Sequence, residues 1–158
     1  MTWRGKLLVF VGALLLANLF LMSVASASTD RVTVIKLTSK TVESQFVDVA
    51  PTGGAPTLGD QFVFSDNLFA GGTKVGIDGG ACTAVRVQHA PAVFQCQVTA
   101  RLHDGDLTAQ GFATQQATNT YAITGGTGRW RNAGGQAVVV SVSETVSKIT
   151  IYATNLGD

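Results

Sequence analysis

The chain has 158 residues, of which 46% are hydrophobic and 13% are charged. So many apolar and so few charged side chains exclude an intrinsically disordered chain. The 11 basic and 10 acidic residues nearly cancel, which excludes the basic surface typical of nucleic-acid-binding proteins and of polybasic membrane-binding patches. The length suits one domain with at most a short appendage.

Residues 1–27 have the organisation of a secretory signal peptide. Arg4 and Lys6 form a basic segment, the run that follows is almost entirely apolar, and Ala25-Ser26-Ala27 fits a signal-peptidase site. The apolar run of about 16 residues is shorter than the roughly 20 needed to span a bilayer, which disfavours the alternative of an uncleaved anchor. We therefore expect a secreted domain over residues 28–158, with no membrane attachment after cleavage.

Cys82 and Cys96 are the only cysteines. An exported chain reaches an oxidising compartment, where such a pair usually forms a disulfide. The two cysteines lie in β-rich runs, residues 82–88 and 93–102, and a hairpin of these runs places them nearly opposite each other. The closed loop of about 14 residues would stabilise the fold by roughly 3 kcal/mol. Two cysteines and two histidines at these spacings do not form a zinc site, and we expect neither metal nor cofactor.

Beyond the signal peptide the sequence is typical of an all-β protein. Short runs rich in Val, Thr, Ile and aromatic residues alternate with clusters of turn residues, and no segment has a sustained helical apolar stripe. The predicted strands cover residues 32–37, 46–49, 60–69, 83–88, 94–102, 106–112, 120–124, 136–142 and 148–153. The predicted turns contain glycine and lie at residues 53–54, 71–72, 78–80, 104–105, 125–128 and 134–135.

Eight or so strands with short connections pair mostly antiparallel, in a sheet that closes into a barrel or folds into a sandwich. Two strands have faces on which polar and apolar residues are mixed. Alternation puts Phe62, Phe64 and Asp66 on one such face, and Cys82, Ala84 and Arg86 on the other. Polar side chains are easier to accommodate around a ligand cavity than in a dry core, so we expect both faces to point into one barrel.

Several segments, spread over about 80 residues, resemble one known family. They are residues 58–60, 64–69, 75–82, 88–91, 109–111, 120–128 and 135–137. The most specific is Tyr-Ala-Ile-Thr-Gly-Gly-Thr-Gly at residues 121–128, followed by Arg-Trp-Arg. In order and spacing these segments are similar to the allene oxide cyclase barrel superfamily, which also contains the dirigent proteins.

The resemblance implies an eight-stranded antiparallel β-barrel with an apolar internal cavity. Members bind hydrophobic or phenolic small molecules and steer their cyclisation or coupling without a metal or organic cofactor. Catalysis of this isomerase-like kind is largely positional, because the barrel holds a flexible intermediate in one reactive shape. The resemblance also implies that the chain can form a homo-oligomer, either a dimer or a trimer.

The resemblance further suggests individual site residues. Asp66 stands where the cyclases have an asparagine that holds a water, and Phe64, Cys82 and Tyr121 match residues of the cyclase cavity. A disulfide would change the role of Cys82. The cyclases also have a glutamate on an early strand that grips the epoxide.

That glutamate would fall near Ile35 or Lys36 in this chain, and it is absent. A lysine there would repel the developing cation. We therefore expect no true allene oxide cyclase activity.

From the residues themselves, Asp66 is the candidate catalytic carboxylate, because it shares a strand face with two phenylalanines. Apolar surroundings raise a carboxyl pKa and suit it to acid–base work. Phe62 and Phe64 would contact a ligand, Arg86 is a candidate partner of Asp66, and Tyr121 is a candidate hydrogen-bond donor. The plainer alternatives are that Asp66 caps a turn at the barrel end and that Tyr121 only packs.

Three functions fit these observations. The first is a secreted barrel that binds an apolar or phenolic small molecule and steers its reaction. The second is a secreted barrel that only carries or sequesters such a ligand. The third is a structural or interaction domain whose barrel is filled with side chains. A cavity of about 300 Å³ or more would favour the first two, and a polar group with a perturbed pKa inside it would favour the first.

Overall fold

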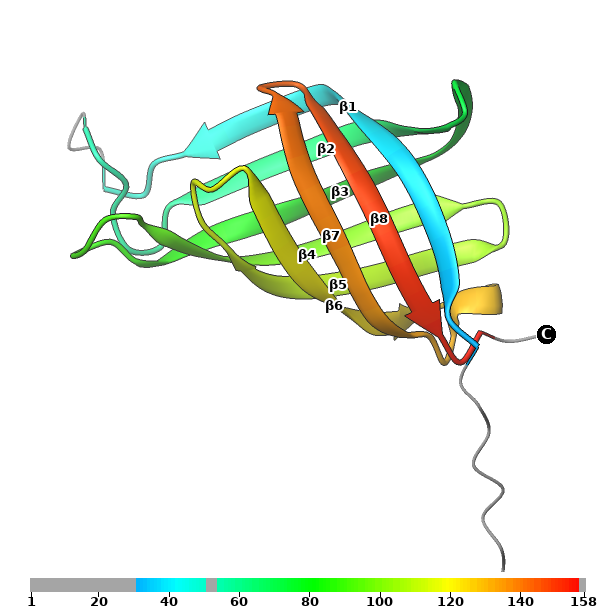
Figure 1. Ribbon diagram of the computed structural model, residues 1–158. Helices are drawn as coiled ribbons and strands as arrows, with labels where there is room; N and C mark the ends of the chain where they lie inside the picture. The colour runs from blue at the N-terminus through cyan, green and yellow to red at the C-terminus, as the bar shows by residue number, and fades with distance from the viewer. Residues whose placement is uncertain (1–30, 51–53, 157–158) are drawn as a thin grey trace, which may run out of the picture.

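The computed structural model describes residues 31–50 and 54–156 (Figure 1). Within these ranges eight strands form one closed barrel, in which sequence neighbours pair antiparallel and β1 also pairs with β8. The strands are β1 (Thr33–Val47), β2 (Gln61–Ala70), β3 (Thr73–Arg86), β4 (Val93–Leu102), β5 (Gly105–Ala113), β6 (Thr118–Gly126), β7 (Gly134–Ser143) and β8 (Val146–Thr154). A short 3-10 helix, η1 (Gly128–Trp130), lies between β6 and β7.

The predicted all-β barrel is confirmed. The predicted signal peptide lies outside the described residues. In the part of the chain that is described, no helix has the length and apolar character required to cross a membrane.

One end of the barrel is closed by an apolar core, which we call the floor. The β2–β3 turn, the β4–β5 turn and η1 all lie at this end (Figure 1). Trp130 of η1 is 3% exposed and belongs to one buried cluster with residues from the strands. The floor consists of Leu37, Leu68, Leu107, Ile123, Trp130, Ala133, Ala137, Ile151 and Ala153. Burying these side chains supplies the main favourable contribution to folding.

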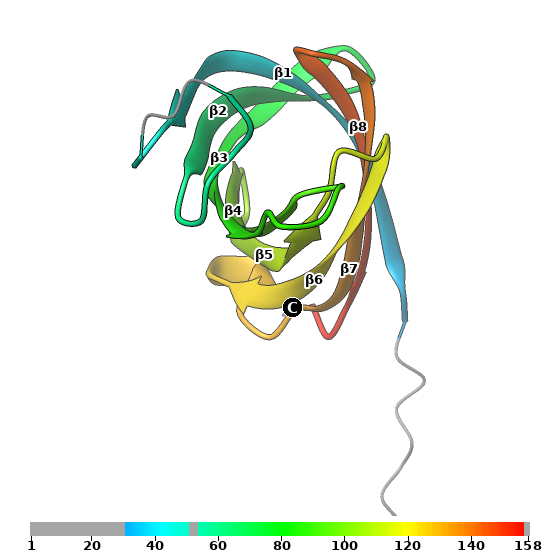
Figure 2. The ribbon, with the colours of Figure 1, turned by 90° about the vertical axis from the view of Figure 1, so that its left-hand side faces the viewer.

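The opposite end, which we call the mouth, carries the β1–β2, β3–β4, β5–β6 and β7–β8 connections. Figure 2 looks along the barrel from this side and shows the strands as a ring. Asp60, only 1% exposed, anchors the β1–β2 connection there. Its carboxylate accepts hydrogen bonds from Thr57 N (2.7 Å), Thr57 Oγ1 (2.8 Å) and Val49 N (3.0 Å). The Thr57 backbone bond, foremost among these, holds the pKa of Asp60 below its usual value.

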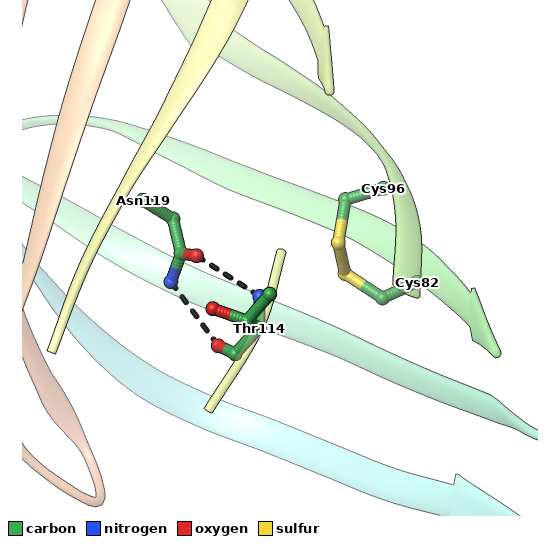
Figure 3. The surroundings of a disulfide bond; sticks show 4 residues. All are labelled: Cys82, Cys96, Thr114 and Asn119. Atoms are coloured by element: carbon green, nitrogen blue, oxygen red, sulfur yellow. Dashed lines mark hydrogen bonds between the residues drawn. A yellow bond between two sulfur atoms is a disulfide. The ribbon is translucent and has the colours of Figure 1, made fainter. Parts of the chain in front are cut away.

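The predicted disulfide is confirmed. Cys82 of β3 and Cys96 of β4 face each other in the register, with their Cα atoms 4.0 Å apart, and are joined by a disulfide (Figure 3). Close to it, Asn119 secures the β5–β6 connection. Its side chain accepts a bond from Thr114 N (3.0 Å) and donates one to Thr114 O (3.4 Å). Both contacts fix backbone near the mouth.

Several predicted boundaries are wrong. Gly134 and Gly135, expected in a turn, begin β7 and pair with β8. Residues 46–49 were expected to form a separate strand, but residues 46 and 47 end the single long β1, which continues through a bulge between Thr41 and Glu43. Residues 78–80 were expected to form a turn, but they lie in the middle of β3. A Cβ at Gly80 would overlap the carbonyl oxygen of Gln97 on β4. Glycine at this position therefore permits close approach of two strands rather than a chain reversal.

Candidate functional site

A cavity of about 250 Å³ lies between the floor and the mouth. This volume is slightly below the roughly 300 Å³ at which ligand pockets usually begin, so it suits a compact molecule. Its walls are largely apolar, from floor residues and from Val98, Ala100, Ala109 and Val139. Polar side chains from several strands and from the β7–β8 turn also line it: Ser39, Thr41, Asp66, Asp78, Tyr121, Ser141, Ser143, Glu144 and Ser147. An apolar cavity with a few convergent polar groups is the usual form of a small-molecule site.

Two carboxylates face each other inside this cavity. Asp66 on β2 and Asp78 on β3 are direct partners in the antiparallel register, and both line the cavity. They are 8% and 7% exposed. Ser39 Oγ on β1 donates a hydrogen bond to Asp66 Oδ2. The Oδ1 atoms of both aspartates are buried and have no hydrogen-bond partner among the described residues. The pair therefore contains two buried acceptors that these residues leave unsatisfied.

The two aspartates cannot both ionise freely. Burial, and after it the negative charge of Asp66, raises the pKa of Asp78 from 3.8 to about 7. Desolvation and a like charge both disfavour the ionised carboxylate. Near neutral pH the pair therefore holds Asp78 partly protonated. A protonated carboxyl beside an ionised one is an arrangement that can donate a proton and accept one.

Aromatic side chains form one wall of the cavity near the mouth. The rings of Phe62 and Phe64 stack with centroids 5.9 Å apart and an interplanar angle of 23°. Phe62 is 40% exposed, whereas Phe64 lies deeper. Tyr121 of β6 is buried and lines the cavity from another strand, and this burial raises the pKa of its hydroxyl. Its phenol therefore stays neutral and can donate a hydrogen bond at physiological pH.

The structure places five of the six predicted site residues on the cavity. Asp66, Tyr121, Phe62, Phe64 and Cys82 all line it, although Cys82 does so as half of a disulfide and presents no thiol.

The prediction that Arg86 points into the barrel beside Asp66 is wrong, because Arg86 is exposed and does not line the cavity. A bulge between Ala84 and Arg86 shifts the β3–β4 register. The simple alternation that put Arg86 on the inward face therefore stops before it reaches this residue.

The two residues near the expected glutamate position on β1 lie outside the cavity. Ile35 packs against the floor, and Lys36 is exposed, so neither side chain reaches the cavity. On β1 the cavity is lined instead by Leu37, Ser39 and Thr41. Lys36 thus exerts no close repulsion on a ligand, and the carboxylates that the cavity does contain come from β2, β3 and the β7–β8 turn.

Sequence reasoning missed Ser39 and Asp78. Asp78 is found by extending the alternation of β3 backwards from Cys82, which puts residues 80 and 78 on the inward face. The Asp-Gly-Gly sequence concealed it, because the same residues are typical of turns. Ser39 had no comparable signal, since a serine between Thr38 and Lys40 is ordinary in a strand.

Two acidic residues of the β4–β5 hairpin form ion pairs outside the cavity. Arg101 bonds to Asp106 (2.9 Å) and His103 to Asp104 (2.8 Å). Among the described residues no group of three or more His, Cys, Asp or Glu side chains is arranged to hold a metal ion.

Comparison with known proteins agrees with this architecture. The family model of the allene oxide cyclase barrel like domain matches residues 34–151. No curated protein sequence matches the chain significantly. A solved structure named pyocyanin demethylase is 32% identical to this chain, with a TM-score of 0.71, and the match covers 77% of this chain and 100% of that one.

Two more distant structures share the fold. One is a pterocarpan synthase dirigent protein, with 20% identity and a TM-score of 0.64, matched over 81% of this chain and 97% of its own. The other is a Diels-Alderase from Streptomyces koyangensis, with 16% identity and a TM-score of 0.66, matched over 84% of this chain and 75% of its own.

The raised pKa of Asp78 predicts how stability changes with pH. The unfolded chain loses this proton near pH 3.8 and the folded chain near pH 7, so Asp78 favours folding most below pH 3.8. This contribution to the unfolding free energy is lost as the pH rises to about 7. The full difference between the folded and unfolded pKa values of Asp78 corresponds to about 4 kcal/mol. As the pH rises from about 4 to 7, the native chain should therefore lose unfolding free energy relative to Asp78→Asn.

Urea unfolding at several pH values from 4 to 8 measures this difference. Asp106→Asn, which removes a surface carboxylate of β5, is the matched control and should show no such trend. Parallel pH profiles for the native chain and Asp78→Asn would contradict the assignment.

Proposed function

Because this chain belongs to the allene oxide cyclase barrel-like domain family, we propose that it binds an apolar or phenolic small molecule in the barrel cavity and steers its rearrangement. The observation that carries the proposal is the Asp66–Asp78 pair, held inside apolar walls next to two stacked phenylalanines. The named substrate of its relative, pyocyanin demethylase, is also a small molecule.

The carboxyl pair supplies the acid–base chemistry in this proposal. Protonated Asp78 donates its proton to an oxygen or nitrogen of the bound molecule as negative charge develops there. Asp66, oriented by the Ser39 hydroxyl, removes a proton from a neighbouring position of the same molecule. One proton enters and one leaves, so the substrate is isomerised and the pair keeps one proton throughout. General acid–base steps of this kind contribute roughly 10²- to 10⁴-fold in rate.

The rest of the cavity positions the substrate. The Phe62–Phe64 wall packs against a ring or an unsaturated chain, and Tyr121 donates a hydrogen bond to a polar substituent. The floor sets how deeply the molecule enters. Restricting a flexible intermediate to one reactive shape accelerates one product and suppresses the others.

We also propose that the domain acts outside the cell. The support is the signal-peptide pattern of residues 1–27 and the Cys82–Cys96 disulfide, since disulfides persist in oxidising compartments. A homo-oligomer, a dimer or trimer, is part of the proposal through the family resemblance alone.

The second candidate is a barrel that binds the same kind of molecule without converting it. The modest cavity volume favours this reading, because a tight cavity suits simple retention of a compact ligand. Ligand binding is common to both candidates, whereas proton transfer to the ligand belongs to the first alone.

Binding in the cavity is tested by filling it. Val139 lines the cavity, whereas its neighbour Val140 is 38% exposed on the outer face of β7. We expect Val139→Phe to weaken binding of 1-naphthol, a compact phenolic probe, by at least about tenfold, since a phenyl ring occupies the space the probe needs. Val140→Phe adds the same ring outside and should bind as the native chain does. Titration calorimetry measures both, and equal affinities would place the probe elsewhere.

Catalysis is tested with the ligand that co-purifies with the exported protein. The ligand is released, identified by mass spectrometry, and incubated with fresh protein in D₂O. Proton transfer by Asp66 should introduce deuterium, and Asp66→Asn should slow this at least about 100-fold. Asp106→Asn is the control and should keep the native rate. Deuterium uptake no faster than in buffer would support the carrier instead.

A further inference from the structure

The charged groups of the cavity are all of one sign. Among the described residues that line it, three are carboxylates, Asp66, Asp78 and Glu144, and none is Lys, Arg or His. Asp66 and Asp78 are more than nine-tenths buried, and Glu144 is exposed in the β7–β8 turn at the mouth. The single predicted cationic partner, Arg86, is exposed and outside the lining. The cavity therefore concentrates negative charge that the chain does not neutralise within it.

The carboxylate oxygens are also short of donors. Within residues 31–50 and 54–156, each aspartate keeps a buried Oδ1 without a partner, and Ser39 donates one hydrogen bond to Asp66. A buried, unpaired acceptor is costly, and a charged one more so, unless something else donates to it or offsets its charge. The Asp66 and Asp78 side chains line the cavity, so a cation bound there lies close enough to offset their negative charge.

The aromatic wall is a second feature that favours a cation. The Phe62 and Phe64 rings line the cavity together with the two aspartates. The face of an aromatic ring attracts a cation, and the attraction increases when water is excluded. Ring faces combined with carboxylates are complementary to a flat cation, whereas they repel an anion.

We propose that the cavity selects a compact aromatic cation over neutral and anionic molecules of the same shape. This inference rests on the proposed function, because it specifies the charge of the molecule that the barrel accepts. The positive charge lies near the two aspartates and the ring system packs against the Phe62–Phe64 wall. A fatty acid or another carboxylate ligand would place a third or fourth negative charge in the cavity and is excluded.

Three probes of one bicyclic skeleton test the proposal: 1-methylquinolinium is a permanent cation, 1-methylnaphthalene its neutral counterpart, and 1-naphthoate an anion. Affinities are measured by titration or ligand-observed NMR at about pH 8, where Asp78 is mostly ionised. The cation should bind at least about tenfold more tightly than the neutral probe, because its charge is attracted to the carboxylates and to the ring faces. The anion should bind most weakly.

Variants that remove one carboxylate test whether the preference for the cation depends on Asp66 and Asp78. Asp66→Asn and Asp78→Asn should each lower the ratio of cation to neutral affinity at least about fivefold, while the neutral probe binds within about twofold of its native affinity. Asp106→Asn removes one negative charge from the outer surface of β5 and should leave the ratio unchanged. Circular dichroism verifies that each variant is folded.

The outcomes separate the two proposals. A neutral probe that binds as tightly as the cation, or a ratio that neither cavity variant changes, overturns the charge selectivity while the cavity remains a ligand site. Failure of all three probes and of 1-naphthol to bind overturns the proposed function as well. Preference for 1-naphthoate contradicts the inference directly.

Discussion

The burial of Asp66 and Asp78 opposite each other is the constraint on which the rest of the structure depends. The antiparallel register of β2 and β3 places the two carboxyl groups opposite each other on the inner face. Like charges in this position repel, and the closed barrel allows neither strand to move its side chain to solvent. Burial, and after it this repulsion, therefore keeps Asp78 partly protonated up to about pH 7. Such a contact is unfavourable for folding, and it must be stabilised elsewhere.

The stabilising features lie on both sides of the pair. Below it, the floor closes the barrel with buried leucine, isoleucine and tryptophan side chains. Above it, the disulfide joins β3 to β4, and Asp60 anchors the β1–β2 connection through three hydrogen bonds. Between these two regions the walls are fixed, so the carboxylates are held in place before any ligand arrives. Preorganised charge of this kind is what an active site or a selective binding site requires.

The sequence was sufficient for the fold class, the disulfide and the inward face of β2. Alternation without interruption identified Phe62, Phe64 and Asp66, and hairpin spacing paired the cysteines. The short β-rich runs indicated an all-β protein, and the family resemblance selected the barrel over the sandwich. Prediction failed where the regular pattern is interrupted. The bulge after Ala84 turns Arg86 outward. The Asp-Gly-Gly sequence is typical of turns, but here it lies within β3. Asp78 became visible only through the register of β2 with β3, which depends on contacts between strands rather than on either strand alone.

The raised pKa of Asp78 beside Asp66 is tested most directly by ¹³C NMR titration of the aspartate carboxyl carbons. The variants Asp66→Asn and Asp78→Asn assign the signals. We expect the Asp78 carboxyl to titrate near pH 7 and the resonance of its neighbour to respond in the same range, as coupled sites do. In Asp66→Asn the transition of Asp78 should move to lower pH, because the neighbouring charge is gone. Two independent transitions near pH 4, as for solvated aspartates, would contradict the account.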